Sequence, residues 1–334
     1  MKRTLLVILG LVGLIGVAAI FLFITQKSAL ISPLSSLSRK VDYSPYSFEN
    51  LRQREYYRSE FKLEKIFQEE ETFTSYLFSY SVDGRRVTGM ANLPKQGVKL
   101  PVAILIRGWV DEKVYKTGMG SEKMAAFLAE NGFLTLAPDF LGFGDSDPAF
   151  PDMLQDRFFK PIVILTLLES LDSLPQADPE RVVIWGHSNG GQVALSVLEI
   201  TGEKIPTSLW APVSAPFPQA VLQYADELED EGKLVRKVIS EFENKYDTAK
   251  YSITTYFDQI EAPLIIHQGM ADEAIPLEWT EELVGRLRSL GKEVTYFQYP
   301  GENHNFHYGS APVARERDLE FFKEKLKSRL DKGS

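Results

Sequence analysis

Cysteine is absent from this chain of 334 residues. Its absence excludes disulfide bonds, a thiol nucleophile, thiolate metal ligands and a lipid-modified cysteine. Histidine is also scarce, since the 4 histidines are scattered and form no His-Glu-x-x-His zinc motif. The chain lacks the Gly-Lys-Ser/Thr sequence of a phosphate-binding loop as well. We therefore predict neither a metal nor an organic cofactor.

Positive charge is in deficit, with 37 Lys and Arg against 46 Asp and Glu and a formal net charge of −9. Binding to a phosphate backbone depends on clustered basic residues, so we expect no nucleic-acid partner. Hydrophobic residues at 44% and charged residues at 25% are ordinary for a globular protein, which excludes disordered and collagen-like classes.

The N-terminal residues 1–27 contain a long apolar run. Lys2 and Arg3 precede an uncharged, mostly apolar stretch from Leu5 to Thr25, which is long enough to cross a bilayer as a helix. The positive residues before it favour a cytoplasmic N-terminus and a catalytic domain outside the cytoplasm. We predict an uncleaved transmembrane anchor; the alternative is a signal peptide cleaved near residues 17–19, which would give a secreted protein.

The rest of the chain divides into two predicted parts. Residues 28–71 read as a linker and surface segment, first rich in Ser and Pro and then polar. Residues 72–334 form the predicted catalytic domain, in which short apolar strands alternate with helices. The predicted strands are 73–82, 86–93, 101–106, 133–138, 182–185, 208–211, 263–267 and 294–299, and the helices are 119–131, 152–174, 189–200, 277–290 and 312–330.

This alternation predicts an α/β fold with a mostly parallel central sheet and helices on both faces. The first two strands flank the turn Asp83-Gly84 and would form an antiparallel hairpin at one edge. Residues 215–255 interrupt the alternation with an acidic, helical pattern. We predict a small helical lid there; a solvated pair of surface helices fits the charge run equally well.

The pentapeptide Gly186–Gly190, read GHSNG, matches the Gly-x-Ser-x-Gly nucleophile elbow and lies between an apolar strand and a helix. Glycines on both sides of Ser188 permit the tight turn, and the following helix presents backbone N–H groups to a developing oxyanion. This context predicts Ser188 as a catalytic nucleophile.

A serine hydroxyl needs a base, and the base needs an orienting acid. We predict His304 as the base because it lies in the loop between the last strand and the last helix; His307 is the rival. Asp272 follows the penultimate strand and is the predicted acid, with Glu273 as its alternative. His187 and His267 are expected to serve neither role.

The loop after the strand 101–106 reads Arg107-Gly108-Trp109-Val110. We predict that the backbone N–H groups of Asn189 and Trp109 form the oxyanion hole. Trp109 and Arg107 are predicted to line the substrate site. For Arg107 two roles stay open, namely steering an anionic substrate or pairing with an acidic neighbour such as Asp111 or Asp139.

Four segments of the chain, GHSNGG, HQGMADEAIP, YPGENHNF and LIRGWVDEKVYKTG, together resemble the prolyl oligopeptidase-like branch of the α/β hydrolases. The resemblance covers the chain from Phe73 onward and implies the α/β-hydrolase fold and a serine hydrolase. Large members of that branch carry a β-propeller, for which there is no room here. They also place a tyrosine hydroxyl near the position of Ile106, so the dienelactone hydrolase and acetyl esterase relatives are the better guide.

Three functions fit these observations. The first is a membrane-anchored serine hydrolase that acts on short peptides. The second is a carboxylesterase for small acyl esters, and the third is a tethered binding domain without chemistry. The expected partners are a small ester or short peptide and, through the N-terminal helix, a membrane. The sequence leaves the oligomeric state open.

Overall fold

The computed structural model describes residues 41–333, with side chains up to residue 328. Both the predicted membrane anchor at residues 1–27 and its signal-peptide alternative lie outside these residues. Within them, no helix is long and apolar enough to span a membrane.

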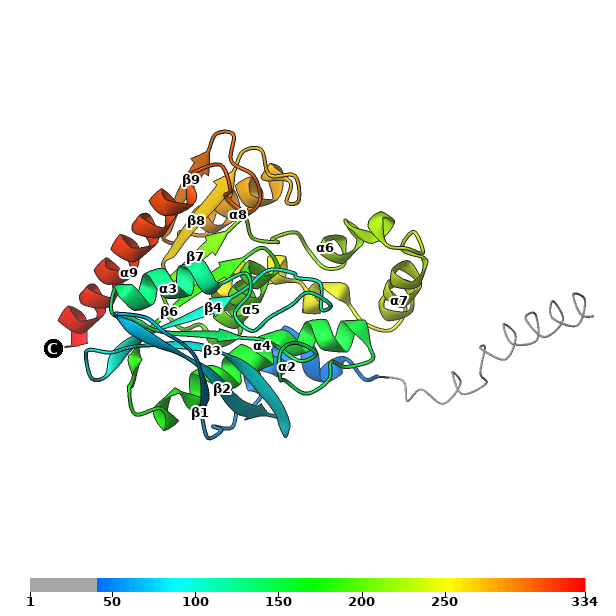
Figure 1. The fold of residues 1–334 in the computed structure, drawn as a ribbon. Helices are drawn as coiled ribbons and strands as arrows, with labels where there is room; N and C mark the ends of the chain where they lie inside the picture. The colour runs from blue at the N-terminus through cyan, green and yellow to red at the C-terminus, as the bar shows by residue number, and fades with distance from the viewer. Residues whose placement is uncertain (1–40, 334) are drawn as a thin grey trace, which may run out of the picture. The chain divides into compact units, whose positions relative to one another are not determined.

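A nine-stranded sheet forms the centre of the molecule, in the order β1-β2-β3-β5-β4-β6-β7-β8-β9 (Figure 1). The strands β1, β2 and β3 pair antiparallel at one edge, and β4 to β9 are parallel. The strands span Lys62–Glu69 (β1), Phe73–Val82 (β2), Arg85–Pro94 (β3), Leu100–Ile106 (β4), Leu134–Pro138 (β5), Ala177–His187 (β6), Thr207–Trp210 (β7), Leu264–Gly269 (β8) and Val294–Tyr299 (β9). The predicted mostly parallel sheet with an antiparallel edge is confirmed.

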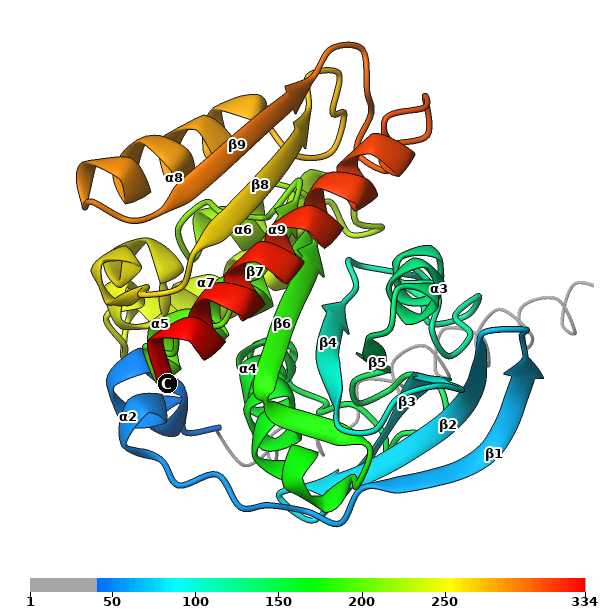
Figure 2. The ribbon, with the colours of Figure 1, turned by 90° about the vertical axis from the view of Figure 1, so that its left-hand side faces the viewer.

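Helices cover both faces of the sheet, as predicted. In Figure 2, α3 and α9 lie in front of the sheet, and α4 and α5 lie behind it. The main helices span Phe48–Gln53 (α2), Glu122–Glu130 (α3), Met153–Ser170 (α4), Asn189–Thr201 (α5), Leu277–Ser289 (α8) and Ala311–Gly333 (α9).

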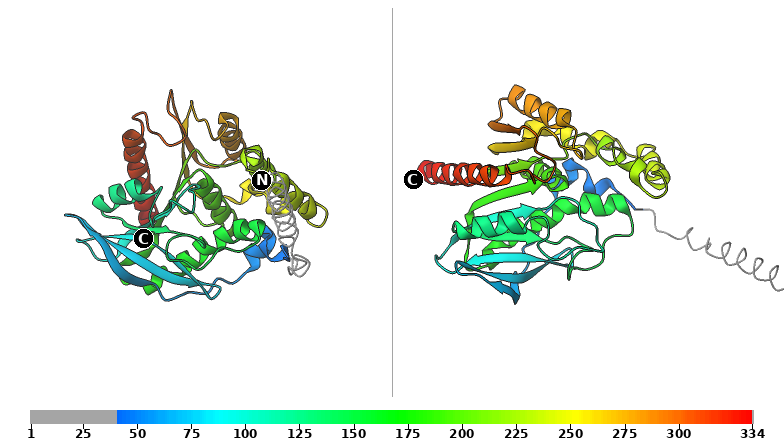
Figure 3. Two further views of the ribbon diagram at one scale, coloured as in Figure 1. Left: turned by 45° about the vertical axis from the view of Figure 1, so that its right-hand side comes forward. Right: turned by 45° about the horizontal axis from the view of Figure 1, so that its top comes forward.

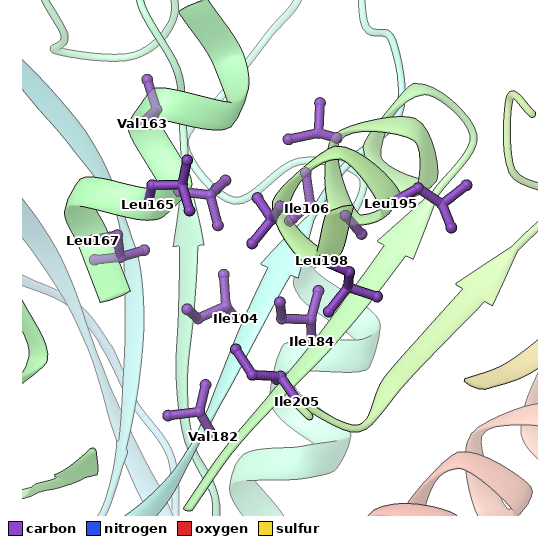
Figure 4. Packing of buried hydrophobic residues seen from close by; sticks show 14 of the residues in the cluster. Ile104, Ile106, Val163, Leu165, Leu167, Val182, Ile184, Leu195, Leu198 and Ile205 are labelled. Carbon is purple, nitrogen blue, oxygen red and sulfur yellow. The ribbon is translucent and has the colours of Figure 1, made fainter. Parts of the chain in front are cut away.

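The larger core cluster lies between the sheet and the helices α4 and α5 (Figure 4). Ile104 of β4 pairs with Leu136 on one side and Ile184 on the other, and all three side chains are fully buried. Because helices cover both faces, these strands are apolar throughout rather than alternating. The ends of these rigid strands carry the loops of the candidate site.

The segment for which a lid is predicted, residues 215–255, forms a group of short helices between β7 and β8, visible as a separate lobe in Figures 1 and 3. It contains α6 (Gln219–Leu222) and α7 (Lys233–Glu243), followed by three 3₁₀ turns. The apolar side of α7 contributes Val235, Ile239 and Phe242 to an aromatic cluster that also includes Phe158 of α4. The lobe therefore packs on α4 through a core of its own.

The boundary predicted at residue 72 is wrong, because the compact unit begins at Tyr43. The helix α2 buries Phe48 and Leu51 against the main core, and β1 extends the sheet by one strand. Residues 43–71 are thus part of the catalytic domain rather than a linker.

Candidate active site

Ser188 lies at the turn between β6 and α5. Its backbone has φ 55° and ψ −122°, in the region that residues with a side chain rarely adopt. Gly190 makes this turn possible, since a Cβ there would overlap the carbonyl oxygen of Ile106. Ser188 is buried, with 7% of the residue's surface exposed. The turn therefore has the strained geometry of a nucleophile elbow.

Asp272 and His304 come together from two loops at the same end of the sheet. The loop after β8 carries Asp272, and the loop between β9 and α9 carries His304. The Nδ1 atom of His304 lies 3.0 Å from Oδ2 of Asp272. Because a carboxylate accepts this hydrogen bond, the ring carries its proton on Nδ1 and leaves Nε2 free to act as a base.

The Asp272 carboxylate is held by several further donors. Its Oδ1 accepts hydrogen bonds from the backbone N–H groups of Ala274 and Ile275, both at 2.8 Å. The side-chain amide of Gln268 donates to Oδ2 at 2.8 Å. Burial alone would raise the pKa of Asp272, but the hydrogen bonds from His304 and from the two backbone groups outweigh it and lower the pKa below its ordinary value. Asp272 is therefore ionised when it orients the imidazole.

Glu273 and His307, the alternative acid and base from the sequence, make other contacts. The backbone N–H of His304 donates to Glu273 Oε2 at 3.2 Å, so Glu273 supports the loop rather than the imidazole. His307 is exposed, and its backbone N–H bonds to Asn303. The structure thus brings His304, and not His307, to Asp272.

Two residues that sequence reasoning did not find position the histidine loop. Glu302 is buried and accepts hydrogen bonds from the backbone N–H groups of Tyr308 and Ser310. His187 Nε2 donates to the carbonyl oxygen of His304 at 3.0 Å. Burial, together with the nearby His304, lowers the pKa of His187 to about 4, so His187 stays neutral near pH 7. Of the two, only His187 could have been found from the sequence, because it is next to Ser188.

The two predicted oxyanion donors border the same cavity. Asn189 begins α5, and both Asn189 and Trp109 line a cavity of about 470 Å³. The loop that carries Trp109 approaches the nucleophile closely, because a Cβ on Gly108 would lie 3.0 Å from the Cβ of Ser188. Trp109 is 75% exposed, which leaves its indole available to a ligand. Its role as an oxyanion donor stays a prediction.

Arg107 does not reach this cavity. It is 7% exposed, and its guanidinium donates to the carbonyl oxygens of Gly108 at 2.9 Å and Asp139 at 3.0 Å. The guanidinium also lies 4.1 Å from the ring centroid of Phe143. The structure therefore does not place Arg107 at this cavity as predicted. The residue instead ties the loop of residues 107–110 to the loop after β5 through a main-chain carbonyl.

His267 is buried in the core and takes neither the role of the base nor that of the acid. Its Nδ1 is 2.7 Å from the Tyr299 hydroxyl, and its Nε2 is 2.9 Å from Asp318 on α9. Among the described residues, no group of three or more His, Asp or Glu side chains is placed to hold a metal ion.

Comparison with known proteins adds independent findings. The family model for the prolyl oligopeptidase family matches residues 120–329. The chain is 26% identical over 239 residues to the "Uncharacterized peptidase YtmA" of Bacillus subtilis (strain 168), which covers 69% of this chain and 86% of that protein.

Solved structures with the same fold include both esterases and peptidases. Acetyl xylan esterase 1 from Thermoanaerobacterium sp. JW/SL YS485 aligns with a TM-score of 0.60 and 15% identity, over 84% of this chain and 93% of that chain. A puromycin-hydrolyzing peptidase from Mycobacterium tuberculosis aligns with a TM-score of 0.61 and 18% identity, over 77% of this chain and 40% of that chain. At such identities the likeness establishes the α/β-hydrolase fold alone.

Proposed function

This chain belongs to the prolyl oligopeptidase family, and from that premise we propose that it is a serine hydrolase that cleaves peptide or ester bonds through an acyl-enzyme on Ser188. The observation that carries the proposal is the 3.0 Å contact between His304 Nδ1 and Asp272. It is supported by the strained strand-to-helix turn at Ser188, whose sequence neighbour His187 bonds to the His304 carbonyl oxygen. The family includes hydrolases for both kinds of bond, so the proposal covers amide and ester substrates.

In this mechanism Ser188 Oγ attacks the substrate carbonyl carbon while His304 Nε2 removes the hydroxyl proton. The backbone N–H groups of Asn189 and Trp109 stabilise the oxyanion of the tetrahedral intermediate. His304 then donates its proton to the leaving group, and the acyl-enzyme forms.

Water completes the cycle by the same route. His304 removes a proton from the water, the oxygen attacks the acyl carbon, and Ser188 leaves with the proton returned by His304. Throughout, Asp272 keeps Nδ1 protonated and stabilises the imidazolium, because its own low pKa holds it ionised.

Labelling with a fluorophosphonate probe tests the nucleophile and the base directly. The full chain should label, and Ser188→Ala and His304→Ala should each lose the label while retaining the wild-type melting temperature. His307→Ala serves as the matched control and should label like the wild type, because His307 is exposed and apart from Asp272. Labelling that persists in Ser188→Ala would refute the proposal.

A substrate panel then distinguishes the two bond types. Hydrolysis of p-nitrophenyl esters and of peptide p-nitroanilides should be compared by kcat/KM, with Ser188→Ala as the blank. Turnover of the anilides would assign peptidase activity, and turnover confined to esters would assign an esterase.

We also propose that residues 1–27 anchor the catalytic domain on the outer side of a membrane. The support is the apolar stretch from Leu5 to Thr25 preceded by Lys2 and Arg3. After alkaline carbonate extraction the full chain should stay in the membrane fraction, whereas a chain lacking residues 1–40 should not. Release of the full chain as a shortened soluble product would instead indicate a cleaved signal.

A further inference from the structure

The cavity that Asn189, the residue after Ser188, helps to line is formed by several separate parts of the chain, among them the loop of Trp109. Asn189 and Gln192 of α5 line it, as do residues of the neighbouring helix α4. The segment before β1 closes one side with Tyr46, Phe48 and Leu51, and the lid insertion adds Val221 and Tyr251. At about 470 Å³ the cavity has the size of a small-molecule site.

A cation in the wall of this cavity lacks an anionic partner. The guanidinium of Arg157 on α4 donates to the neutral side-chain oxygen of Gln192. In the part of the chain that the structure describes, no carboxylate forms an ion pair with Arg157. Burial lowers the pKa of Arg157 to about 10, which still leaves it charged at neutral pH.

The neighbouring charges do not cancel this cation. Lys160 and Asp156 also line the cavity, and they pair with each other at 3.6 Å. Burial lowers the pKa of Lys160, and the nearby Arg157 lowers it further. The cavity therefore carries a net positive charge, and a partly buried charge without a counterion is costly unless a ligand supplies one.

The cavity lies on the acyl side of the proposed reaction. It is lined by Asn189 and Trp109, the predicted oxyanion donors, and not by His304. The leaving group must stay next to His304, which protonates it, and the residues after His304 line a different pocket of about 290 Å³. With the carbonyl oxygen between the two donors, the acyl chain extends into the larger cavity.

The spacing on α5 sets how far the cation lies from the reacting carbonyl. Gln192 follows Asn189 by three residues, which is about 4.5 Å along the helix axis. Both residues line the cavity, so they lie on the same face of α5. An acyl chain of about two to four methylenes spans that distance and the hydrogen bond beyond it.

We propose that this cavity is an acyl-binding site for substrates whose acyl part ends in a carboxylate, such as a dicarboxylic monoester or monoamide or an acidic residue, and that Arg157 binds that carboxylate. The inference rests on the proposed function, because it takes Ser188 as the nucleophile and the loop of Trp109 as part of the oxyanion hole.

Two esters with the same five-carbon acyl chain test the inference. Mono-p-nitrophenyl glutarate ends in a carboxylate, whereas p-nitrophenyl pentanoate ends in a methyl group. The wild-type full chain should hydrolyse the glutarate ester with a kcat/KM about 10- to 100-fold higher, as expected for a charge-assisted hydrogen bond. Arg157→Gln should remove this preference and leave the pentanoate rate within about 3-fold, and Arg157→Lys should restore part of it.

Matched variants and a binding measurement separate the possible outcomes. Lys237→Gln removes an exposed cation from α7 that does not line the cavity, and it should keep the preference. If Arg157→Gln lowers both rates equally, Arg157 only joins α4 to α5 and the inference is wrong. Equal rates on the two esters in the wild type would overturn it as well, although serine hydrolysis itself would stand.

Calorimetric binding of glutaramate to Ser188→Ala keeps the test independent of turnover. Glutaramate, with an amide at one end and a carboxylate at the other, should bind at least about 10-fold more tightly than pentanamide, which has no carboxylate, and the added Arg157→Gln change should abolish the difference. If neither ester is hydrolysed and the fluorophosphonate label is absent, the proposed function fails; the calorimetry still decides whether Arg157 binds a carboxylate.

Discussion

At the scale of single residues, the environment of a carboxyl group decides what it can do, and two acidic residues of this chain show opposite cases. Asp272 is buried but receives hydrogen bonds from two backbone N–H groups, the Gln268 amide and His304. Glu199 on α5 is also buried, yet both of its carboxyl oxygens lack a hydrogen-bond partner. The first is held ionised, whereas burial raises the pKa of Glu199 well above its ordinary value.

Asp272→Asn tests the orienting role of the carboxylate. The amide keeps the size of the side chain, but its NH₂ group cannot accept the Nδ1–H of His304, so the ring is no longer held in the tautomer that frees Nε2. We expect kcat to fall by about 10³- to 10⁴-fold with a smaller change in KM, as for this change in other Ser-His-Asp enzymes. Kinetics with the best ester or peptide substrate measures it.

The control for this variant is Glu273→Gln. Glu273 accepts from the backbone N–H of His304, and a glutamine oxygen can accept the same hydrogen bond. Its kcat should stay within about 3-fold of the wild type. A similar loss in both variants would mean that the loop as a whole, rather than the Asp272 carboxylate, was disturbed.

Glu199→Met should stabilise the protein, because it replaces a buried carboxyl group without partners by an apolar side chain of similar length. The folded state holds the Glu199 proton at pH values where the unfolded chain releases it, so the wild type loses stability as the pH rises above the unfolded pKa of about 4.5. The variant should gain about 1–3 kcal/mol at pH 7 and little near pH 4.

Urea unfolding of the wild type and of Glu199→Met at pH 4, 5.5 and 7 measures this gain. Glu203→Met, at an exposed position just beyond α5, controls for the loss of one negative charge and should change the stability by less than about 0.5 kcal/mol. A gain that is the same at all three pH values would contradict the titration argument.

At the scale of elements, helices and strands with a clear apolar pattern can be predicted from the sequence, whereas those without such a pattern are missed. The strand β4 is a continuous apolar run and β5 is apolar except for Thr135, so their positions follow directly from the sequence. By contrast, β1 reads KLEKIFQE and is exposed along most of its length. Charged residues are typical of an edge strand, and they hide the alternation that would reveal it. The helix α2 has 6 residues, too few for a helical period to be visible.

The candidate site divides in the same way. Ser188, Asp272 and His304 could be predicted because each follows a strand of the expected sheet in a known order. Gln268 and Glu302 act through contacts that depend on how loops fold back, which a linear pattern does not encode. Arg107 was misplaced for the same reason, since only the packed structure shows the carbonyl of Asp139 within its reach.

The contact between the N-terminal segment and the lid yields an element-scale prediction. The Tyr43 hydroxyl donates to Asp152 at the start of α4 at 2.7 Å, and its ring centroid lies 5.2 Å from that of Phe242 on α7. Tyr43→Ala removes both contacts and should loosen the lid lobe. We expect faster hydrogen exchange in α7 and a loss of about 1–3 kcal/mol in stability.

Exchange in α8, which packs on the main core, is the internal reference and should not change. Tyr57→Ala provides the matched variant, because Tyr57 is 74% exposed and, among residues 41–333, its hydroxyl bonds only to the nearby Glu55. Unchanged exchange in α7 of Tyr43→Ala would show that the lid is held by its own cluster alone.

At the scale of the whole molecule, the segment 43–71 joins three parts that are otherwise distant in the sequence. It adds β1 to the antiparallel edge, packs α2 on α5 and the 3₁₀ turns before β8, and closes the proposed acyl site with Tyr46, Phe48 and Leu51. The same segment therefore contributes both to the stability of the domain and to the shape of the cavity. Chains that begin at different residues within it separate the two contributions.

Truncated chains make that separation measurable. A chain of residues 41–334 should unfold in one cooperative transition and take the fluorophosphonate label, because the compact unit begins at Tyr43. A chain of residues 72–334, which starts at the boundary expected from the sequence, exposes the edge of β2 and loses the buried Phe48, Leu51 and Phe61. Removing several buried side chains at about 2–5 kcal/mol each exceeds the usual stability of a domain, so this chain should not fold.

An intermediate chain of residues 58–334 keeps β1 and Phe61 but lacks α2 and the side chains that close the acyl site. It should fold with a lower melting temperature, because the edge of β2 stays paired while part of the core is lost. If the acyl site is where we place it, the kcat/KM of this chain on mono-p-nitrophenyl glutarate should fall by a larger factor than its rate of labelling by the fluorophosphonate probe. If the chain of residues 72–334 instead had the melting temperature and the activity of the chain of residues 41–334, the N-terminal segment would not be needed for folding. The closed cavity would then not be needed for activity.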